Sequence, residues 1–383
     1  MARILEDWIE SYMKYTSHTE PPTLYRKWVA VSTIASVLQR KCLLPWGSEL
    51  FYPNLYIVLV GPPAARKGTA MRPGRELLSK LGVTMAADES SRQRLIRTLQ
   101  QTADAHQTKE GRLNYHCSLT IISSELTVFL GYDNKDLVTM LCKWYDCEDR
   151  FVYETVSRDR EEVPNVWVNL LGATTPGLLQ ASLPAAAISS GFTSRIIFVY
   201  AEDKAKVVTK PTLDPDIEPM LLNDLGEIRL MNGRFYTTSG FDELYEHWRN
   251  KAESMPVFKD TRLDYYVQRR PAHLFKTTMI ISAARRDALE LTEHDLMDAI
   301  TMLEEVEEPM PHVFRGVGTN PLAGVQLQVM AVLNKRNSIP LKELADIFFS
   351  DLSRSQLGEV ISTMESMGFC AFDAANRCVT RTK

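Results

Sequence analysis

Apolar residues recur at helical spacing near the start of the chain. Residues 24–39 place them on one face at intervals of three to four positions. Thr23 can cap a helix that begins here, and the pair Pro21 and Pro22 stops any helix that precedes it. The pattern predicts a packed helix ahead of the main sheet.

The middle of the chain alternates between unbroken apolar runs and helical patterns. Unbroken apolar runs are typical of strands that are buried on both faces of a parallel sheet. Such runs occupy residues 55–60, 83–87, 119–123, 166–172 and 195–200. Helical patterns, such as residues 91–105 and 136–145, separate them. We therefore expect an α/β fold with a three-layer parallel sheet.

The pattern becomes predominantly helical beyond a charged, proline-containing connector at residues 203–216. Helical patterns follow at residues 217–230, 241–254, 265–286 and 292–307. A second break, around residues 307–321, precedes a compact last module. We divide the chain into an N-terminal helical region, a core, a helical lid domain and a C-terminal module, at residues 1–50, 51–205, 206–315 and 322–383.

The last module predicts a winged-helix fold. Three helical patterns precede two short strands with a turn at residues 374–376; they occupy residues 327–333, 339–349 and 353–369. The third helix of such a module often lies in the DNA major groove. Here that helix carries Arg354 with Glu359, so Arg377 on the wing is the better candidate for a phosphate contact. Contact with another protein is an equal alternative.

Composition narrows the class of protein. The 383 residues are too many for one compact core, and 45% hydrophobic with 24% charged residues is typical of globular proteins. No apolar run is long enough to span a membrane and residues 1–10 do not resemble a signal peptide, so we expect a cytoplasmic protein without a membrane partner. Six scattered cysteines without a CxxC pair argue against zinc. The net charge of −4 still permits local basic surfaces that bind nucleic acid.

A candidate phosphate-binding loop follows the strand at residues 55–60. Gly61 and Lys67 have the spacing of the pattern G-x-x-x-x-G-K-[ST]. Arg66 stands at its second glycine and would add a cation beside the anion. Gly68 stands at its magnesium-binding hydroxyl, for which Thr69 is the nearest substitute. The segment predicts a site for nucleotide phosphates, with Thr69 as metal ligand; the alternative is a proline-rich turn with an incidental lysine.

Polar residues follow the next two strands of the predicted sheet. Glu125 comes after residues 119–123 and is a candidate general base, while Ser124 occupies the place where an aspartate is usual. Thr174 and Thr175 end the next strand, where hydroxyls can orient a water molecule. A surface glutamate and a simple turn are the alternatives.

One arginine, Arg195, stands at the start of the last predicted strand. We expect it in an exposed turn, from which it can reach across a subunit boundary and stabilise charge on a transferring phosphoryl group. The alternative is an ordinary surface arginine.

The serial order of these motifs resembles the AAA+ helicase group. The stretches are GPPAARKGTA, IISSEL, GATTP, GFTSR and, after a helical region, LTEHDLMDAI. They are most similar to minichromosome-maintenance and superfamily-3 type motors and to helicase-like ATPases of phages and prophages, over about residues 25–308. The individual motifs are loose, and their order is the specific feature.

The resemblance implies a role for each motif residue. Lys67 and Thr69 would belong to Walker A, Glu125 to Walker B, Thr174 or Thr175 to sensor 1, Arg195 to the arginine finger, and Arg269 or Arg270 to sensor 2. ATP and Mg²⁺ would be the cofactors. Gly68 and Ser124 depart from the family pattern, which leaves magnesium coordination open.

Residues 150–168 predict a β-hairpin with a polar SRDRE tip. In helicase-type motors a hairpin before sensor 1 points into a central pore, so the resemblance implies that Arg158 and Arg160 approach a nucleic-acid backbone. The acidic neighbours Asp159 and Glu161 favour the alternative of a solvated turn.

These observations predict an oligomeric, hexameric-ring ATPase that acts on single-stranded DNA, a phage-type replicative helicase in the cytoplasm of a host. Its C-terminal module would contact replication proteins. Two alternatives stay open. One is an ATP-switched DNA-binding or helicase-loading factor with weak hydrolysis, and the other is a scaffold that has lost nucleotide binding.

Overall fold

The computed structural model describes residues 2–88, 90–107, 111–131, 134–155, 158–182, 191–254, 257–314, 323–349 and 352–382. The chain forms two compact units, Met1–Val313 and Phe314–Lys383, which are described separately. Across the described ranges, every helix is too short or too polar to cross a bilayer.

A five-stranded sheet forms the centre of the first unit, in the order β4-β5-β8-β3-β9. Its strands are β3 (Tyr56–Val60), β4 (Ala103–Gln107), β5 (Leu113–Ser123), β8 (Val166–Thr174) and β9 (Ile196–Tyr200). Strands β5, β8, β3 and β9 run parallel, whereas β4 is antiparallel to β5. Every residue of β3, β8 and β9 is buried, which explains their unbroken apolar sequences. The protein is therefore a mixed α/β fold with a largely parallel sheet.

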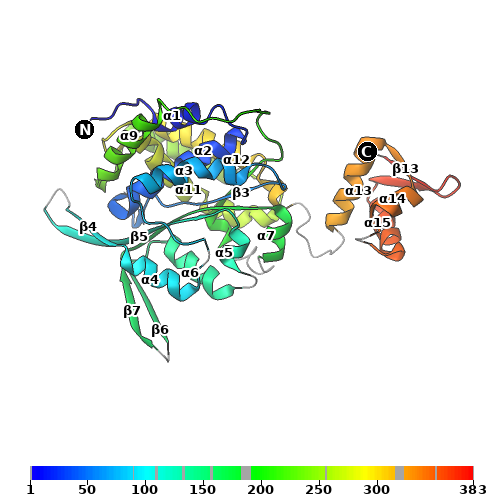
Figure 1. The fold of residues 1–383 in the computed structure, drawn as a ribbon, viewed down its shortest axis with the longest axis horizontal. Helices are drawn as coiled ribbons and strands as arrows, with labels where there is room; N and C mark the ends of the chain where they lie inside the picture. The colour runs from blue at the N-terminus through cyan, green and yellow to red at the C-terminus, as the bar shows by residue number, and fades with distance from the viewer. Residues whose placement is uncertain are drawn as a thin grey trace. The chain divides into compact units, whose positions relative to one another are not determined.

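Helices cover both faces of this sheet (Figure 1). On one side lie α2 (Thr23–Leu38), α3 (Lys67–Lys80), α11 (Asp264–Arg285) and α12 (Glu293–Glu307), with α1 (Trp8–Tyr15) and α9 (Glu218–Leu230) packed against α2. On the other lie α4 (Arg92–Gln101), α5 (Leu126–Leu130), α6 (Lys135–Tyr145) and α7 (Pro176–Ser182). The three predicted layers are present.

Shorter elements complete the unit. Strands β1 (Cys42–Trp46), β2 (Glu49–Phe51) and β10 (Gly233–Arg234) form a small sheet after η1 (Gln39–Lys41), and β11 (Tyr236–Thr237) pairs with β12 (Glu290–Leu291). The remaining helices are η2 (Thr193–Arg195), α10 (Ser239–Ser254), η3 (Thr261–Leu263) and η4 (Met310–Phe314).

Two elements differ from the sequence prediction. The strand expected at residues 83–87 is reduced to a single parallel bridge between Met85 and Thr120. The helix expected to reach residue 105 ends at Gln101, and β4 follows it directly. Four of the five β4 residues are exposed, so this edge strand has no apolar pattern that could announce it.

The predicted hairpin is present as β6 (Arg150–Thr155) and β7 (Arg158–Pro164), which extends away from the sheet (Figure 1). Its turn is shorter than the predicted SRDRE tip, residues 157–161. Thr155 pairs with Arg158, so Arg158 begins β7 and Arg160 lies within that strand. Residues 156–157 lie outside the described ones.

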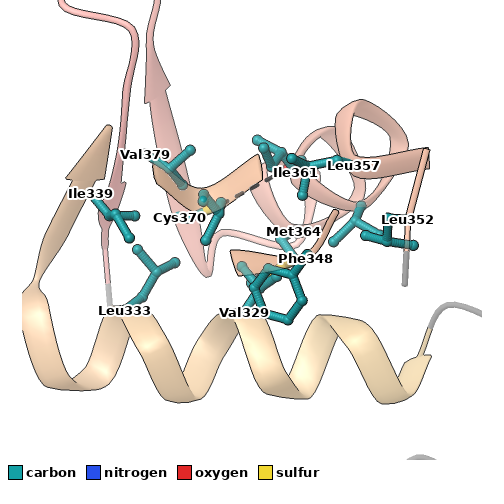
Figure 2. Close-up of a cluster of buried hydrophobic side chains, with 12 residues drawn as sticks. Val329, Leu333, Ile339, Phe348, Leu352, Leu357, Ile361, Met364, Cys370 and Val379 are labelled. Carbon is teal, nitrogen blue, oxygen red and sulfur yellow. Dashed lines mark hydrogen bonds between the residues drawn. The ribbon is translucent and has the colours of Figure 1, made fainter. Parts of the chain in front are cut away.

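The second unit contains α13 (Ala323–Arg336), α14 (Leu341–Ile347) and α15 (Arg354–Ser366), with strands β13 (Ser338–Pro340), β14 (Cys370–Asp373) and β15 (Cys378–Arg381). The strands form an antiparallel sheet in the order β13-β15-β14. A small apolar core joins helices and sheet; Val329, Phe348 and Val379 belong to it (Figure 2). Ser353 caps α15 through a capping box with Gln356.

Candidate functional site

A tight loop, residues 61–66, connects the carboxyl end of β3 to the start of α3. The Gly61 N–H donates to the carbonyl of Thr174 at the end of β8 (3.4 Å). A Cβ atom at Gly61 would lie 2.3 Å from the Ala201 carbonyl oxygen and 2.4 Å from the Tyr25 hydroxyl. Only glycine therefore fits where the loop leaves the sheet.

The loop backbone leaves donors open at the start of α3. Arg66, at the N-cap, has φ 61° and ψ 25°, the left-handed conformation that glycine adopts most easily. The N–H groups of Arg66, Lys67, Gly68 and Thr69 have no backbone acceptor among the residues that the structure describes. Open donors at a helix N-terminus favour an anion. Arg66 thus stands at the second glycine position of the pattern G-x-x-x-x-G-K-[ST], and its backbone has the left-handed conformation that a glycine there would adopt without strain.

The side chain of Lys67 folds back along this loop. Its ammonium group donates to the carbonyls of Gly61 (2.8 Å) and Pro62 (2.9 Å). Burial lowers the pKa of Lys67, and the negative charge of Glu125 opposes that shift. Lys67 and Glu125 therefore lie within electrostatic reach of each other. Among the residues that the structure describes, the hydrogen-bond partners of the ammonium group are backbone carbonyl oxygens.

Glu125 and Thr174 follow strands at the same carboxyl edge. Glu125 is exposed at the N-cap of α5, and its side chain accepts no capping hydrogen bond. Thr174 is buried and pairs with Val60 in the sheet register. Thr175 accepts a hydrogen bond from the Leu178 N–H at the start of α7 (3.3 Å). The structure thus brings Gly61, Lys67, Glu125 and Thr174 to one edge.

Arg66, which the sequence predicts as a cation beside an anion, pairs with a carboxylate of its own chain. Its guanidinium forms an ion pair with Glu20 (2.7 Å). Glu20 also pairs with Lys204 (3.1 Å) and accepts a hydrogen bond from the Val208 N–H (3.4 Å). The charge of Arg66 is therefore already engaged. Gly68 and Thr69 are exposed, and a Cβ at Gly68 would meet no atom within 4 Å.

Arg195 lies in a different environment from the exposed turn that the sequence predicts. Its side chain is only 10% exposed, and it precedes β9, at the amino edge of the sheet. Nε donates to Asp146 (3.2 Å), a second guanidinium nitrogen bonds the same carboxylate, and a third donates to the Gly191 carbonyl (2.6 Å). The expectation of an exposed arginine is wrong because Asp146, at the end of α6, covers it.

A polar cluster surrounds this ion pair, and we name it the amino-edge cluster: Tyr145, Asp146, Arg195, Arg269, His273 and Lys276. Arg269 also pairs with Asp146 (3.3 Å). His273 Nε2 donates to the Ser194 carbonyl (3.0 Å) and the Tyr145 hydroxyl donates to Nδ1 (3.2 Å). Burial lowers the pKa of His273 to about 3 and that of Lys276 to about 8. Only the helical spacing of polar residues in α11 hinted at this cluster in the sequence.

Arg270, a candidate for sensor 2, is buried within the helical part of the unit. It pairs with Glu307 (2.7 Å), and its guanidinium lies 5.0 Å from the centre of the Trp248 ring. Burial raises the pKa of Glu307, and Arg270 opposes that shift. The partners of Arg270 therefore lie on α10 and α12, the helices that carry Trp248 and Glu307.

The proposed DNA contacts lie elsewhere in the chain. Arg158 and Arg160 lie on β7, and their side chains are outside the described part of the structure. Arg377 precedes β15 in the second unit, is exposed and has φ 50°. Its carbonyl accepts a hydrogen bond from the Leu341 N–H (2.8 Å).

No family model matches the chain, and no curated protein matches it. The described residues also contain no group of three His, Cys, Asp or Glu side chains that could hold a metal ion. At the loop and the neighbouring strand end, Thr69 offers an exposed hydroxyl and Glu125 an exposed carboxylate. One hydroxyl and one carboxylate would hold Mg²⁺ only together with phosphate oxygens, because Mg²⁺ is usually bound through one or two carboxylates plus the phosphates of a substrate.

Proposed function

We propose that the protein is an ATP-dependent DNA motor of AAA+ type, a phage-like replicative helicase that works as an oligomeric ring. One observation carries the proposal. The open N–H groups of residues 66–69 and the ammonium group of Lys67 meet at the end of β3, beside the strand ends that lead to Glu125 and Thr174. Converging donors, a lysine and a nearby carboxylate match the needs of phosphate binding and hydrolysis.

Each residue has a role in this proposal. The N–H groups of residues 66–69 bind phosphate oxygens, and Lys67 exchanges its two carbonyl partners for a phosphate. The carboxylate of Glu125 is exposed and accepts no capping hydrogen bond, so we assign it the role of accepting a proton from water. The carbonyl of Thr174 supports the loop through the hydrogen bond that it accepts from the Gly61 N–H. ATP would supply the phosphoryl group and Mg²⁺ would neutralise its charge, with Thr69 as the protein hydroxyl closest to the metal.

The rest of the proposal concerns nucleic acid. The β6–β7 hairpin extends from the sheet and carries Arg158 and Arg160 on one strand, which suits a strand of DNA. The second unit has three helices and an antiparallel hairpin, the elements of a winged helix, with Arg377 at the hairpin. We propose that it contacts DNA or a replication protein.

A second candidate is an ATP-switched DNA-binding or helicase-loading factor with weak hydrolysis. Two observations favour it. Gly68 offers no hydroxyl at the position where the pattern places a metal ligand. Arg195, the proposed finger, is buried and engaged with Asp146 of its own chain, so it must leave this partner before it can reach a neighbour. A scaffold without nucleotide is the third candidate, and it has only these departures in its favour.

The test measures ATP hydrolysis with and without single-stranded DNA, together with the melting temperature with ATP. The Lys67→Ala variant removes the ammonium group and should abolish both hydrolysis and the thermal shift. Lys80→Ala, at the other end of α3, is the matched control and should behave as wild type. Equal behaviour of the two variants would refute nucleotide binding at this loop.

Two further results separate the candidates. A motor separates a DNA duplex in the presence of ATP, whereas a loading factor binds ATP and separates none. Gly68→Thr restores the missing hydroxyl at a position with free space, so a motor limited by metal coordination should hydrolyse ATP faster in this variant. A scaffold shows no ATP-dependent change in melting temperature.

A further inference from the structure

A basic pocket of about 690 Å³ lies where η1, β1 and β10 meet the first half of β5. Its lining includes Arg40, Lys41, Arg112 and Arg234. One carboxylate, Asp149, is also among its lining residues, and it is ion-paired with Arg40 (2.5 Å). The pocket therefore carries excess positive charge, although the whole chain has a net charge of −4.

Two of these cations have no carboxylate partner in the described part of the chain. Lys41 is 9% exposed, and its ammonium group donates to the carbonyl of Arg229. Burial lowers the pKa of Lys41 to about 8; the charge of Arg229 adds to this shift, whereas Cys42 and Asp104 oppose it. Arg234 is exposed and is held beside Leu43 by the pairing of β10 with β1. Both groups are thus available to an anion.

Two histidines add polar atoms without partners. His116 is 2% exposed, and its Nδ1 lies 2.9 Å from the Ser118 hydroxyl. Its Nε2 has no hydrogen-bond partner among the described residues, and the same holds for Nδ1 of His106. The two rings lie 5.5 Å apart, and both residues line the pocket. These two ring nitrogens are exceptions to the rule that buried polar atoms are hydrogen-bonded, and their residues belong to the wall of the pocket.

An aromatic side chain stands at the same place. Tyr115 lines the pocket and is 59% exposed, and its carbonyl accepts a hydrogen bond from the Asn165 side chain (2.7 Å). Asp149 directly precedes the β6–β7 hairpin and Asn165 directly follows it, so the pocket lies at the root of that hairpin. Cations beside an exposed aromatic ring are the usual means of binding single-stranded nucleic acid.

We propose that this pocket binds a phosphate group, carried by a single-stranded nucleic acid. Lys41 and Arg234 neutralise the phosphate, and Tyr115 stacks on a neighbouring base. The inference goes beyond the proposed function because it requires no nucleotide at Lys67. It would hold for a motor, a loading factor or a scaffold.

The test measures binding of a fluorescent oligothymidylate by anisotropy, without ATP, over a range of salt concentrations. Arg234→Glu should weaken binding about tenfold or more and reduce the slope of log affinity against log salt by about one. Arg249→Glu, which reverses an arginine on α10 outside the pocket, is the matched control and should bind as wild type. Because ATP is left out of the assay, binding at this pocket is measured separately from nucleotide binding at the loop after β3.

A second variant guards against loss of fold. Lys41→Met removes a desolvated charge, so it should weaken binding while the melting temperature is retained or raised. Tyr115→Ala should weaken binding with little change in the salt dependence. Unchanged affinity in both Arg234→Glu and Lys41→Met would overturn the inference.

Inorganic phosphate distinguishes the source of the group. If the pocket binds a nucleic-acid strand, inorganic phosphate at millimolar concentration leaves the melting temperature unchanged. In that case Arg234→Glu, Lys41→Met and Tyr115→Ala weaken the binding of oligothymidylate. If it serves a free phosphate compound, phosphate raises the melting temperature of wild type and fails to do so in Arg234→Glu, which also supports a phosphate site. Absence of both effects contradicts the assignment.

Discussion

The two edges of the central sheet handle polar groups in opposite ways. At the carboxyl edge, the N–H groups of residues 66–69 lack backbone acceptors among the described residues, and Lys67 has only carbonyl partners. At the amino edge, Arg195 is engaged with Asp146, and both ring nitrogens of His273 have partners. Donors left open indicate a binding site, whereas polar groups that satisfy one another indicate a structural role. The difference supports the loop after β3 as the site of chemistry.

The largest expected loss of stability comes from a substitution at the carboxyl edge. Gly61→Ala places a methyl group 2.3 Å from the Ala201 carbonyl oxygen, so the loop must shift and the free energy of unfolding should fall by about 3 kcal/mol. Gly68→Ala is the control, because a Cβ there meets no atom within 4 Å, and it should be neutral or slightly stabilising. Urea unfolding measures both. Equal stability of the two variants would show that the loop is not tightly held.

A smaller loss of stability is expected from a substitution at the amino edge. Asp146→Ala leaves the buried guanidinium of Arg195 without its carboxylate and should lower the free energy of unfolding by about 2 kcal/mol, less than for a fully buried pair because Asp146 is partly exposed. Asp149→Ala is the matched control. Its partner Arg40 keeps the carbonyls of Cys147 and Val166, so the loss should stay below about 1 kcal/mol.

The amino edge also predicts a pH dependence. The pKa of His273 is about 3 in the folded protein, whereas an unfolded histidine has a pKa of about 6.5. Below pH 6.5 the unfolded state therefore binds a proton that the folded state does not, and stability falls as the pH falls. From pH 6.5 to 5 the loss should be about 1.5 kcal/mol.

His273→Gln isolates this contribution, since glutamine can keep a donor towards Ser194 and an acceptor towards Tyr145. Other groups, such as His116 with a pKa lowered to about 4, act equally in both proteins. Thermal unfolding at pH 6.5 and 5 compares the two. An identical pH dependence in variant and wild type would mean that His273 is protonated in the folded state.

The smallest effect sharpens the view of the loop. Arg66→Gly and Arg66→Ala both lose the ion pair with Glu20. The left-handed backbone at φ 61° is strained for alanine, whereas glycine adopts it without a free-energy penalty. The glycine variant should therefore be more stable than the alanine variant by about 1 kcal/mol. Chemical denaturation measures this difference. The opposite order would mean that the loop relaxes to another conformation.

Local patterns predicted the elements well where side chains are buried on a regular spacing. The helix expected at residues 24–39 is α2, Thr23–Leu38, and the run at 166–172 lies within β8. Exposed strands give no such signal, so the helical pattern at residues 91–105 continues into the first residues of β4. The partner of Arg195 is 49 residues away, on a different element, and no local pattern relates Arg195 to Asp146. The spacing from Gly61 to Lys67 identified the loop, but the ion pair of Arg66 depends on tertiary packing.

That ion pair links the loop to a distant part of the same unit. Glu20 holds Arg66 with one oxygen and Lys204 with the other, and its backbone carbonyl accepts a hydrogen bond from the Ala205 N–H (3.0 Å). The connector that leads from β9 to the helical region is thus fastened to the carboxylate that restrains the loop. An anion that attracted Arg66 would weaken its ion pair with Glu20, the same carboxylate that holds residues 204–208. Binding at the loop would therefore be coupled to the mobility of this connector.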